Sequence, residues 1–421
     1  MMKNIGIIGV GMMGLGHSLG FDMISDCKVV AVADSNDKQL EMIKYAFKRC
    51  SPQYFNDYRE ILNMAEVDAV VIATPSYLHQ KMTIDALKAN KDVFLEKPIA
   101  PSIETTDEII MALAKTDRIL QVGLVYRYSN LYRTIVHLIE EGRFGNVMMA
   151  YCKEYRDNFS NLWFFDETKS GGALLDKNCH HFDLFNWFIN SPPKSVFAQG
   201  GKHVVKSGHK IQCAYSKHQG EIIKDPSIVD HANVLIEFEN GAKGNLGLCM
   251  YEIEPIEGLE IGIMGDNGSW ALAKKDEKLV IAGGPIGNKE EIFLDYYSDN
   301  EGVGHIGCQT ERREFLECLE TRKQPFANLK IARDSCVVAF AAEKSIREGR
   351  IVSISEFFNP EVDAVFNKLG YDKLPKTPPV FSLETPQQKL KLKKKLKTKK
   401  KQLERDLERI EKEIRNVSNK F

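Results

Sequence analysis

The chain has 421 residues, of which 43% are hydrophobic and 27% charged, the composition of a folded protein long enough for two domains and a further segment. A formal net charge of −1 excludes a general electrostatic attraction to nucleic acid or anionic membranes, and no run approaches the roughly 18 consecutive apolar residues of a membrane span. The nine cysteines lack the paired spacing of a zinc site or a disulfide framework. We therefore expect a cytoplasmic protein with no bound metal ion, membrane span or nucleic acid partner.

Residues 1–124 alternate short apolar runs with amphipathic segments. The runs are rich in β-branched residues and too short for helices, which is typical of buried strands. They span residues 4–10, 28–34, 68–74, 92–98 and 119–124. Amphipathic stretches such as 76–90 and 102–116 predict the intervening helices. This alternation predicts a doubly wound parallel sheet of the Rossmann type, covered by helices on both faces.

A glycine motif follows the first predicted strand. Gly9, Gly11 and Gly14 have the G-x-G-x-x-G spacing that allows a tight turn, close approach of a pyrophosphate and close helix packing. Asp34 ends the second predicted strand, 20 residues after Gly14, where an acid hydrogen-bonds a ribose 2′-hydroxyl. Its carboxylate would repel the 2′-phosphate of NADP. The motif therefore predicts NAD as the cofactor, with NADP as the alternative.

Two charged residues end the fourth predicted strand. Glu96 and Lys97 precede Pro98, which stops the strand, and the carboxyl edge of a doubly wound sheet is where ligands bind. Lys97 is therefore either a ligand-facing group or a solvated strand end.

The pattern changes after a predicted helix near residues 128–141. Two-residue alternation predicts strands over 146–155, 230–239, 241–251 and 257–265, and helical periodicity returns at 309–321 and 332–348. We expect a second domain over residues 125–355, with a mostly antiparallel sheet that has helices on one face and is open on the other. Exposed sheet faces usually pair, so we expect a homodimer or homotetramer.

The segment at 171–187, GGALLDKNCHHFDLFNW, combines helical periodicity with many titratable groups. On a helix, Asp176, His180 and Asp183 share one face, whereas Lys177 and His181 point elsewhere. The shared face is a chemical site, a metal site that lacks further evident ligands, or a hydrogen-bonded polar cluster in the core.

Residues 201–228 form a polar insertion before the next predicted strand. We interpret it either as a surface loop or as a cover over the substrate mouth that brings His203, His209 or Lys210 inward.

The C-terminal part has a different composition. Residues 356–388 are predicted to be a linker punctuated by prolines, and residues 389–421 to form a charged helical tail with heptad-spaced apolar positions. Lysines are dense over 389–401. The tail is expected either to self-associate as a short coiled coil or to bind an acidic partner or anionic lipid.

Together these features resemble the Gfo/Idh/MocA oxidoreductase family, named after glucose–fructose oxidoreductase and inositol dehydrogenase. The resemblance covers about residues 3–355 and rests on four motifs: the glycine motif, ATPSYLH at 73–79, Glu96-Lys97-Pro98, and G-G-x-L-x-D-x-x-x-H-x-x-D at 171–183. It implies an N-terminal NAD(P)-binding domain and a sugar or cyclitol held against the open-faced sheet. The implied reaction is hydride transfer between a secondary alcohol and the nicotinamide.

Carried over by motif, Lys97, Asp176 and His180 match the family's catalytic triad. A neutral His180 suits proton removal near neutral pH, and Lys97 would stabilise negative charge developing on the oxygen, although the two roles are exchangeable. The resemblance also implies substrate binding at Lys97, Tyr126, Arg127, Trp163, Asp176, His180 and Asp183. It implies cofactor binding at Gly9, Gly11, Met12, Met13, Gly14, Asp34, Thr74, Pro75, His79, Glu96, Lys97 and Gln121.

Two departures from the family pattern argue against transferring any particular substrate: Asn178 stands where many members have glycine, and His181 doubles the histidine. Two rival functions also remain. One is an NAD-using glycosidase or epimerase that oxidises its substrate transiently without net NADH. The other is a non-catalytic regulator that binds a sugar or nucleotide, against which the intact Lys97, Asp176 and His180 argue.

Overall fold

The computed structural model describes residues 2–157, 159–211, 216, 218–252, 259–274, 278–283, 289–293 and 307–371. The predicted helical tail at 389–421 lies outside these residues, so its self-association and its acidic partner stay predictions. No helix within the described ranges is long and apolar enough to cross a membrane.

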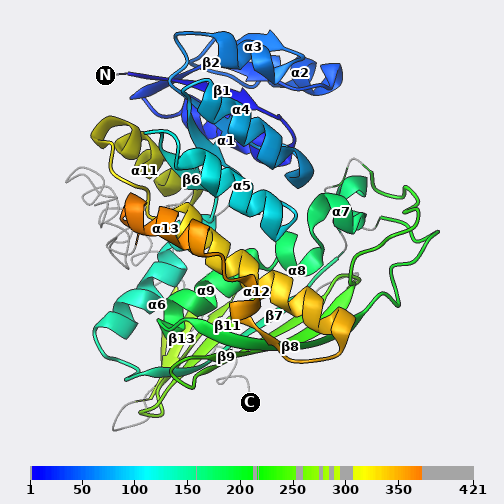
Figure 1. The fold of residues 1–421 in the computed structure, drawn as a ribbon, viewed down its shortest axis with the longest axis vertical. Helices are drawn as coiled ribbons and strands as arrows, with labels where there is room; N and C mark the ends of the chain where they lie inside the picture. Colours follow the sequence, from blue (N-terminus) through cyan, green and yellow to red (C-terminus); the bar gives the residue numbers. More distant parts are fainter. Residues whose placement is uncertain are drawn as a thin grey trace, which may run out of the picture. The chain divides into compact units, whose positions relative to one another are not determined.

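The N-terminal strands form a parallel sheet, sheet A, in the order β3-β2-β1-β4-β5-β6 (blue to cyan in Figure 1). Their bounds are β1 Lys3–Ile8, β2 Cys27–Ala33, β3 Gln53–Phe55, β4 Ala69–Ile72, β5 Asp92–Leu95 and β6 Leu120–Val122. All neighbouring pairs run parallel, which confirms the predicted doubly wound sheet. The edge strand β3 is not among the predicted strands, because three residues carry too little hydrophobic pattern.

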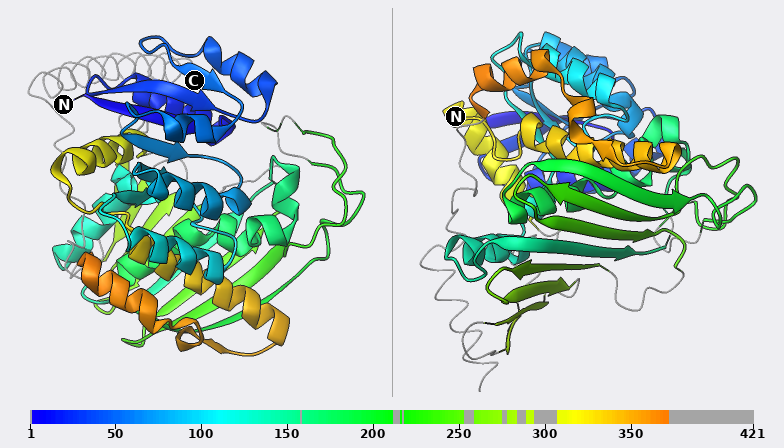
Figure 2. Two further views of the ribbon diagram at one scale, coloured as in Figure 1. Left: turned by 45° about the horizontal axis from the view of Figure 1, so that its top comes forward. Right: turned by 60° about the horizontal axis from the view of Figure 1, so that its bottom comes forward.

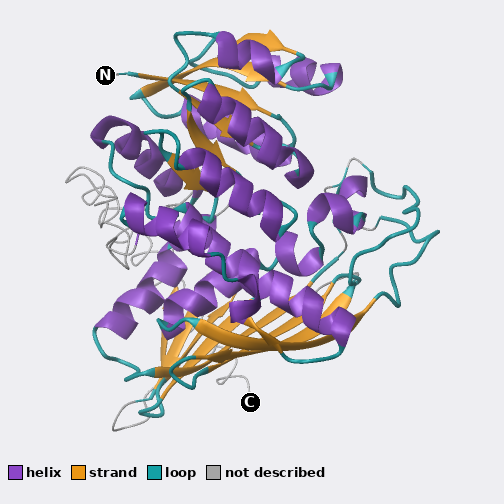
Figure 3. Ribbon diagram, viewed as in Figure 1, coloured by secondary structure: helices purple, strands orange, loops and turns teal. Residues whose placement is uncertain are grey.

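Helices cover both faces of sheet A, as Figure 3 shows. They are α1 Met12–Asp22, α2 Asp37–Lys44, α3 Tyr58–Asn63, α4 His79–Lys88 and α5 Ile103–Leu113. Side-chain caps define their starts: Ser102 and Thr105 form a capping box on α5, and Asn36 caps α2. The strands β4 and β5 are buried throughout, as expected for a sheet covered on both sides.

The second sheet, sheet B, has nine strands in the described residues, in the order β14-β13-β12-β11-β7-β10-β9-β8-β15. Their bounds are β7 Val147–Tyr155, β8 Pro193–Gly201, β9 His231–Phe238, β10 Lys243–Cys249, β11 Glu260–Gly265, β12 Trp270–Lys274, β13 Lys278–Ala282, β14 Lys289–Phe293 and β15 Val352–Ser353. Neighbours are antiparallel except β7 and β10, which are parallel. The mostly antiparallel sheet is therefore confirmed.

One face of sheet B is packed and the other is open (Figure 2, right). In β9 the residues alternate between buried and partly exposed, so the packed face takes every second side chain. The covering helices are α6 Asn130–Glu140, α8 Ala173–Asp176, α9 Cys179–Ile189 and α12 Leu329–Glu348, and α7 Glu167–Ser170 lies at one end.

A helix from the predicted second domain completes the core of the first. Helix α11, Cys308–Thr321, places Phe315 against Phe94 of β5, with ring centroids 5.5 Å apart in an edge-to-face arrangement. Both side chains are fully buried in the cluster under sheet A. The chain thus returns to the Rossmann domain after building sheet B.

Residues 356–388 differ from the expected linker at their start. Helix α13, Pro360–Leu369, begins with Asn359 as its cap and packs on α5, with Phe366 buried. Proline at the first helical position suits a helix start, so this proline begins an element rather than interrupting one.

Helix α12 carries a buried acid beneath α8. A Cβ on Gly172 would lie 2.6 Å from Glu343 Oε1, so the carboxyl group packs directly on the turn that begins α8. Burial raises the pKa of Glu343 to about 7; the charge of Glu167 raises it further, and Arg347 opposes it. The fold thus holds a carboxyl group that titrates near neutral pH.

Replacing Phe315 with alanine is expected to destabilise the protein by about 3–5 kcal/mol, because it opens a cavity between α11 and sheet A. The urea midpoint measures this change. Phe358→Ala is the matched control, since Phe358 is 67% exposed and its loss should change stability by no more than about 0.5 kcal/mol. A loss below about 1 kcal/mol for Phe315→Ala would contradict the packing of α11 on sheet A.

Glu343→Gln is expected to make stability less dependent on pH. The folded-state pKa of Glu343 lies above its unfolded value, so the native state binds more protons and wild-type stability falls as pH rises from about 4.5 to 7. Relative to wild type, the variant should gain about 2–3 kcal/mol between pH 4.5 and 8. Urea unfolding at several pH values tests this, with exposed Glu239→Gln as the control; parallel pH profiles for wild type and Glu343→Gln would refute it.

Candidate functional site

The glycine turn between β1 and α1 has the geometry of a dinucleotide cradle. Gly9 has φ +84°, and a Cβ on Gly14 would lie 1.9 Å from the Gly9 carbonyl oxygen, so both positions require glycine. A Cβ on Gly11 would meet nothing within 4 Å, so there is open space beside the start of α1. Backbone N–H groups at a helix N-terminus bind phosphate. The turn therefore fits a pyrophosphate, with the exposed Met12 beside it.

Asp34 lies at the end of β2, next to this turn. Its Oδ2 accepts the backbone N–H of Val10 at 2.8 Å, and its Oδ1 accepts that of Asn36 at 2.8 Å. These bonds hold a carboxylate beside the glycine turn, where it fits the diol of an adenosine ribose.

His79, which is predicted to bind the cofactor, joins two loops of the Rossmann domain. Its Nδ1 lies 2.8 Å from the carbonyl oxygen of Pro98, and its Nε2 lies 2.9 Å from that of Thr74. The ring is buried and links the end of β4, where Thr74 and Pro75 lie, to the cis peptide Lys97-Pro98 after β5.

Glu96 is buried beneath Lys97. Its Oε1 lies 2.7 Å from His17 Nε2 on α1, and its Oε2 accepts the backbone N–H of Lys97 at 3.1 Å. Arg312 of α11 donates from Nε to His17 Nδ1 at 3.3 Å. Burial lowers the pKa of His17, and since Nδ1 accepts from Arg312, the neutral ring donates its Nε2 proton to Glu96.

Sequence reasoning missed His17 and Arg312. They lie 295 positions apart, and the local sequence around neither residue indicates that it reaches the other. Gln121 is held in the same region, where its Nε2 donates to the carbonyl oxygen of Glu311 at 3.0 Å. Its Oε1 is buried and has no hydrogen-bond partner among the described residues.

Lys97 and Asp176 meet between the two sheets. Lys97 Nζ donates to the Asp176 carbonyl oxygen at 2.7 Å and lies 3.6 Å from its Oδ2. Ser76, from the loop after β4, donates to Asp176 Oδ1 at 3.2 Å. Burial by itself lowers the pKa of the Lys97 ammonium, but the charges of Asp176 and Glu96 outweigh it and the net pKa lies above the usual value. Lys97 is therefore a held cation, not a solvated strand end.

The predicted 171–187 helix is interrupted after Asp176. Helix α8 ends there, Lys177 and Asn178 form a break, and α9 begins at Cys179, so His180 lies in the first turn of a new helix. The His180 ring is buried and stacks on Tyr126, with centroids 4.6 Å apart and planes at 29°.

Arg127 and Asp183 pair with each other. Arg127 Nε and Nη2 donate to the two Asp183 carboxylate oxygens at 2.7 and 2.8 Å, and both side chains are buried. The guanidinium also lies over the rings of Trp187 and Phe326, 4.8 and 5.0 Å from their centroids. This pair ties η2, Val125–Tyr128, which carries Tyr126, to α9.

The two departures from the family pattern contact each other. Asn178 Nδ2 lies 3.0 Å from His181 Nδ1, and His181 Nε2 lies 3.6 Å from Glu154 Oε2 on β7. Burial lowers the pKa of His181 to about 4, so the ring is neutral. The His181 ring therefore lies between Asn178 and Glu154, and its centroid is 5.7 Å from that of Tyr126.

Aromatic side chains lie beside this region. Trp163 of η3, Leu162–Phe165, is half-buried and contacts the Tyr77 ring, with centroids 6.4 Å apart. The insertion at 201–228 supports η3 from outside, because Ser227 N donates to Phe165 O at 2.9 Å and its Oγ accepts the Glu167 N–H at 2.7 Å.

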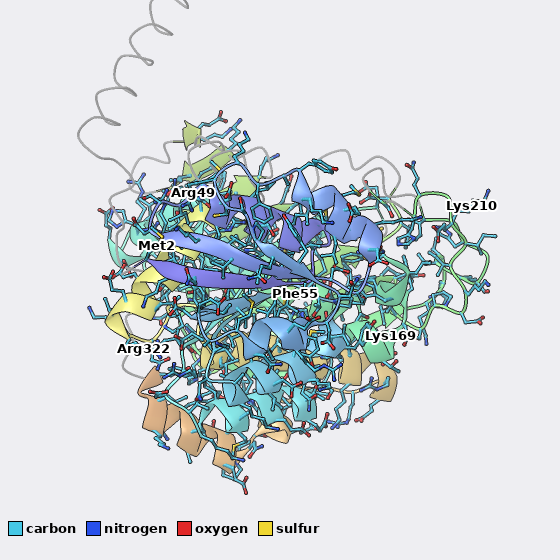
Figure 4. All side chains as sticks on the ribbon, turned by 90° about the horizontal axis from the view of Figure 1, so that it is seen from above. Met2, Arg49, Phe55, Lys169, Lys210 and Arg322 are labelled. Carbon is cyan, nitrogen blue, oxygen red and sulfur yellow. The ribbon has the colours of Figure 1, made fainter. Side chains whose placement is uncertain are left out.

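The three polar side chains of the insertion that are considered as inward-facing differ in exposure. His203 and Lys210 are exposed, whereas His209 is half-buried. Figure 4 shows Lys210 at the periphery, on the side where Lys169 marks α7. No cluster of three or more histidine, cysteine or acidic side chains in the described part of the chain could hold a metal ion.

Comparison with known proteins agrees with this geometry. Residues 3–124 match the oxidoreductase family with an NAD-binding Rossmann fold, and residues 132–271 match the GFO/IDH/MocA C-terminal domain. The chain is 24% identical to myo-inositol 2-dehydrogenase of Thermotoga maritima over 84% of this chain and 98% of that protein. It is 26% identical to scyllo-inositol 2-dehydrogenase (NAD(+)) of Bacillus subtilis, over 83% of this chain and 95% of that protein.

Solved structures share the fold. Levoglucosan dehydrogenase in complex with NADH aligns with a TM-score of 0.71 at 19% identity, over 84% of this chain and 99% of the other. Lactobacillus casei scyllo-inositol dehydrogenase with NAD(H) and scyllo-inositol aligns with a TM-score of 0.66 at 20% identity, over 84% and 100%. With both domain patterns matched in order, the chain belongs to the GFO/IDH/MocA family of oxidoreductases.

Proposed function

We propose that this protein oxidises a secondary alcohol of a sugar, sugar derivative or cyclitol, with NAD⁺ as the hydride acceptor. The observation that carries the proposal is the contact of Lys97 with Asp176, which joins the carboxyl edge of sheet A to the helices on sheet B. Relatives that are inositol dehydrogenases make a cyclitol or sugar the expected substrate class.

The protonation states suggest a division of roles. Lys97 keeps its proton because Asp176 and Glu96 raise its pKa, so it suits stabilisation of negative charge on the substrate oxygen. His180 is then the group left to accept the hydroxyl proton. Asp176 holds the ammonium of Lys97 in place. A bound nicotinamide would supply the hydride acceptor.

The remaining predicted substrate residues divide by their contacts. Tyr126, stacked on His180, and Trp163 are proposed to contact the substrate ring directly. Arg127 and Asp183 bond to each other in the core, so we propose that they act by positioning Tyr126 and α9. His79 and Glu96, which are predicted to bind the cofactor, are likewise proposed to position the Lys97 segment.

NAD⁺ is the proposed cofactor in preference to NADP⁺. The Asp34 carboxylate lies beside the glycine turn, where a 2′-phosphate would meet a like charge. The pyrophosphate would lie against Gly11 at the start of α1, and the Gln121 Oε1 acceptor lies deeper in the domain.

A substrate screen with both cofactors tests the function. Wild type is expected to produce one NADH per substrate oxidised, with kcat/KM for NAD⁺ at least ~10-fold above that for NADP⁺, since a desolvated like charge costs over 1.4 kcal/mol. His180→Asn and Lys97→Met should each lower kcat by ~10²-fold or more, because each removes a group needed in the transition state.

Cofactor affinity is the control. Titration with NAD⁺, followed by protein fluorescence, should give similar Kd values for wild type and both variants. Turnover of substrate without net NADH would favour the transient-oxidation alternative. Full turnover in both variants would refute the assigned site.

We also propose that the open face of sheet B pairs with the same face of a second copy. Leu235, Met149 and Met264 lie on this face and are each about half exposed. Exposed large apolar side chains gathered on one open sheet face favour an interface.

The combined variant Met149→Lys and Leu235→Lys is expected to shift the protein from a dimer or tetramer towards monomer, because each new charge would be buried on association. Light scattering coupled to gel filtration measures the mass. Phe358→Lys, at an exposed apolar position away from sheet B, should leave the mass unchanged. A monomeric wild type would contradict the proposal.

A further inference from the structure

Three cationic side chains cluster beside the catalytic residues. Lys177 follows Asp176 directly, and Arg156 comes just after β7, on the face of the sheet that carries Glu154. The three positive charges lie close enough to repel one another. We call Lys97, Lys177 and Arg156 the cationic wall.

The carboxylates that partner this wall lie behind it. The side chains of Lys97, Lys177 and Arg156 are 19, 16 and 25% exposed, whereas those of Asp176 and Glu154 are 8 and 6% exposed. Asp157, at 17%, is the remaining carboxylate in contact with Arg156. Solvent therefore reaches the three cations more readily than Asp176 and Glu154, whereas Asp157 is about as exposed as Lys177.

The ion pairs behind the wall leave donors available. Glu154 Oε1 lies 3.4 Å from Lys177 Nζ and 3.7 Å from an Arg156 terminal nitrogen, longer than the 2.7–2.9 Å of a charge-assisted hydrogen bond. Asp157 Oδ1 is also 3.7 Å from Arg156. An ammonium has three donors and a guanidinium has five, so these contacts do not exhaust them.

Other contacts place the wall within the substrate region. The Arg156 guanidinium lies over the Phe159 ring, 4.7 Å from its centroid, and Phe159 packs on Phe164 beside Trp163. Glu154, which partners Lys177, also lies close to His181, and the His181 ring is near that of Tyr126. Arg156 thus lies near the aromatic side chains of η3, and Lys177 lies next to the catalytic Asp176.

A purely structural role accounts poorly for this arrangement. Buried ion pairs contribute little net stability, because desolvation offsets their attraction, and Lys177 loses solvation without gaining a short hydrogen bond. Burial lowers the pKa of Lys177, which Glu154 only partly restores. An incoming anion would supply the missing partner.

We propose that the substrate is an acidic sugar whose carboxylate binds Lys177 and Arg156 while its secondary hydroxyl lies at Lys97 and His180. This inference rests on the proposed function and specifies its substrate class. A carboxylate in place of a hydroxymethyl group converts neutral contacts into two charge-assisted ones. Donors built for that carboxylate would be left unpaired by the neutral sugar, which is the basis of strong discrimination.

Matched sugar pairs test the inference. NADH production is measured with D-glucuronate against D-glucose and with D-galacturonate against D-galactose. Wild type is expected to show kcat/KM at least ~10-fold higher for one uronate than for its neutral partner, the factor that one charge-assisted bond supplies. Calorimetric titration of the NAD⁺-loaded protein with the same sugars gives Kd values independently of turnover.

Variants of the cationic wall test whether it causes the preference for the uronate. Lys177→Met should lower the uronate-to-neutral ratio of kcat/KM by at least ~10-fold. Because Lys177 adjoins Asp176, Arg156→Gln is the second variant and should lower the same ratio. Lys210→Met, which removes an exposed lysine from the insertion, is the control and should leave the ratio unchanged.

The outcomes separate this inference from the function on which it rests. Neutral sugars or cyclitols turned over as well as uronates would overturn the acidic-sugar class while leaving the dehydrogenase intact. So would a ratio that is unchanged in both variants, or a sugar phosphate preferred over the uronate. Absence of NADH with every substrate would overturn the proposed function, and calorimetry would then show whether uronate binding still depends on Lys177.

Discussion

The contact between Lys97 and Asp176 is the constraint to which the rest of the site is fitted. Lys97 ends a strand of sheet A, whereas Asp176 ends a helix on sheet B, 79 positions later in the chain. A lysine removed from water stays charged only where nearby carboxylates compensate for the lost hydration. The position of one domain's strand end against the other domain's helix end is therefore set by electrostatics as well as by packing.

Two buried networks hold the partners of this contact. His17 and Arg312 fix Glu96 under the Lys97 backbone, so α1 and α11 both support the strand end. On the other side, Arg127 and Asp183 tie the segment bearing Tyr126 to α9. Such buried ion pairs add little to the free energy of unfolding. Removing one partner, however, leaves an unpaired buried charge, so few alternative side-chain arrangements are tolerated. Their effect is geometric: they hold side chains that must act together.

The departures from the family pattern belong to one physical unit. Asn178 and His181 contact each other, and His181 lies behind Glu154, which in turn partners Lys177. The sequence leaves the second histidine, His181, unexplained. In the structure it lies behind the residues that partner the cationic wall. The neutral state of His181 fits this position, because a neutral ring lies beside Asn178 and Glu154 without adding another buried cation.

Much of the fold could be predicted from short stretches of the sequence. The strands of sheet A are continuous apolar runs, and the turn requires glycine at Gly9 and Gly14 because a Cβ at either position would strike backbone atoms. Apolar runs and glycine turns are short-range properties of the chain. The sequence by itself therefore determined the doubly wound sheet, the cofactor turn and the segments bearing Lys97, Asp176 and His180. It also indicated the alternating strands of sheet B.

Only the tertiary structure decided how distant residues share the site. Arg312 reaches His17 because α11 returns to sheet A, and the break after Asp176 turns His180 onto Tyr126 and Lys177 towards Glu154. Arg127 and Asp183 bond to each other, not outward. Periodicity describes which residues share a face of one element. Which charges meet depends on how the elements pack and on the cost of leaving a buried charge unpaired, and neither quantity is local in sequence.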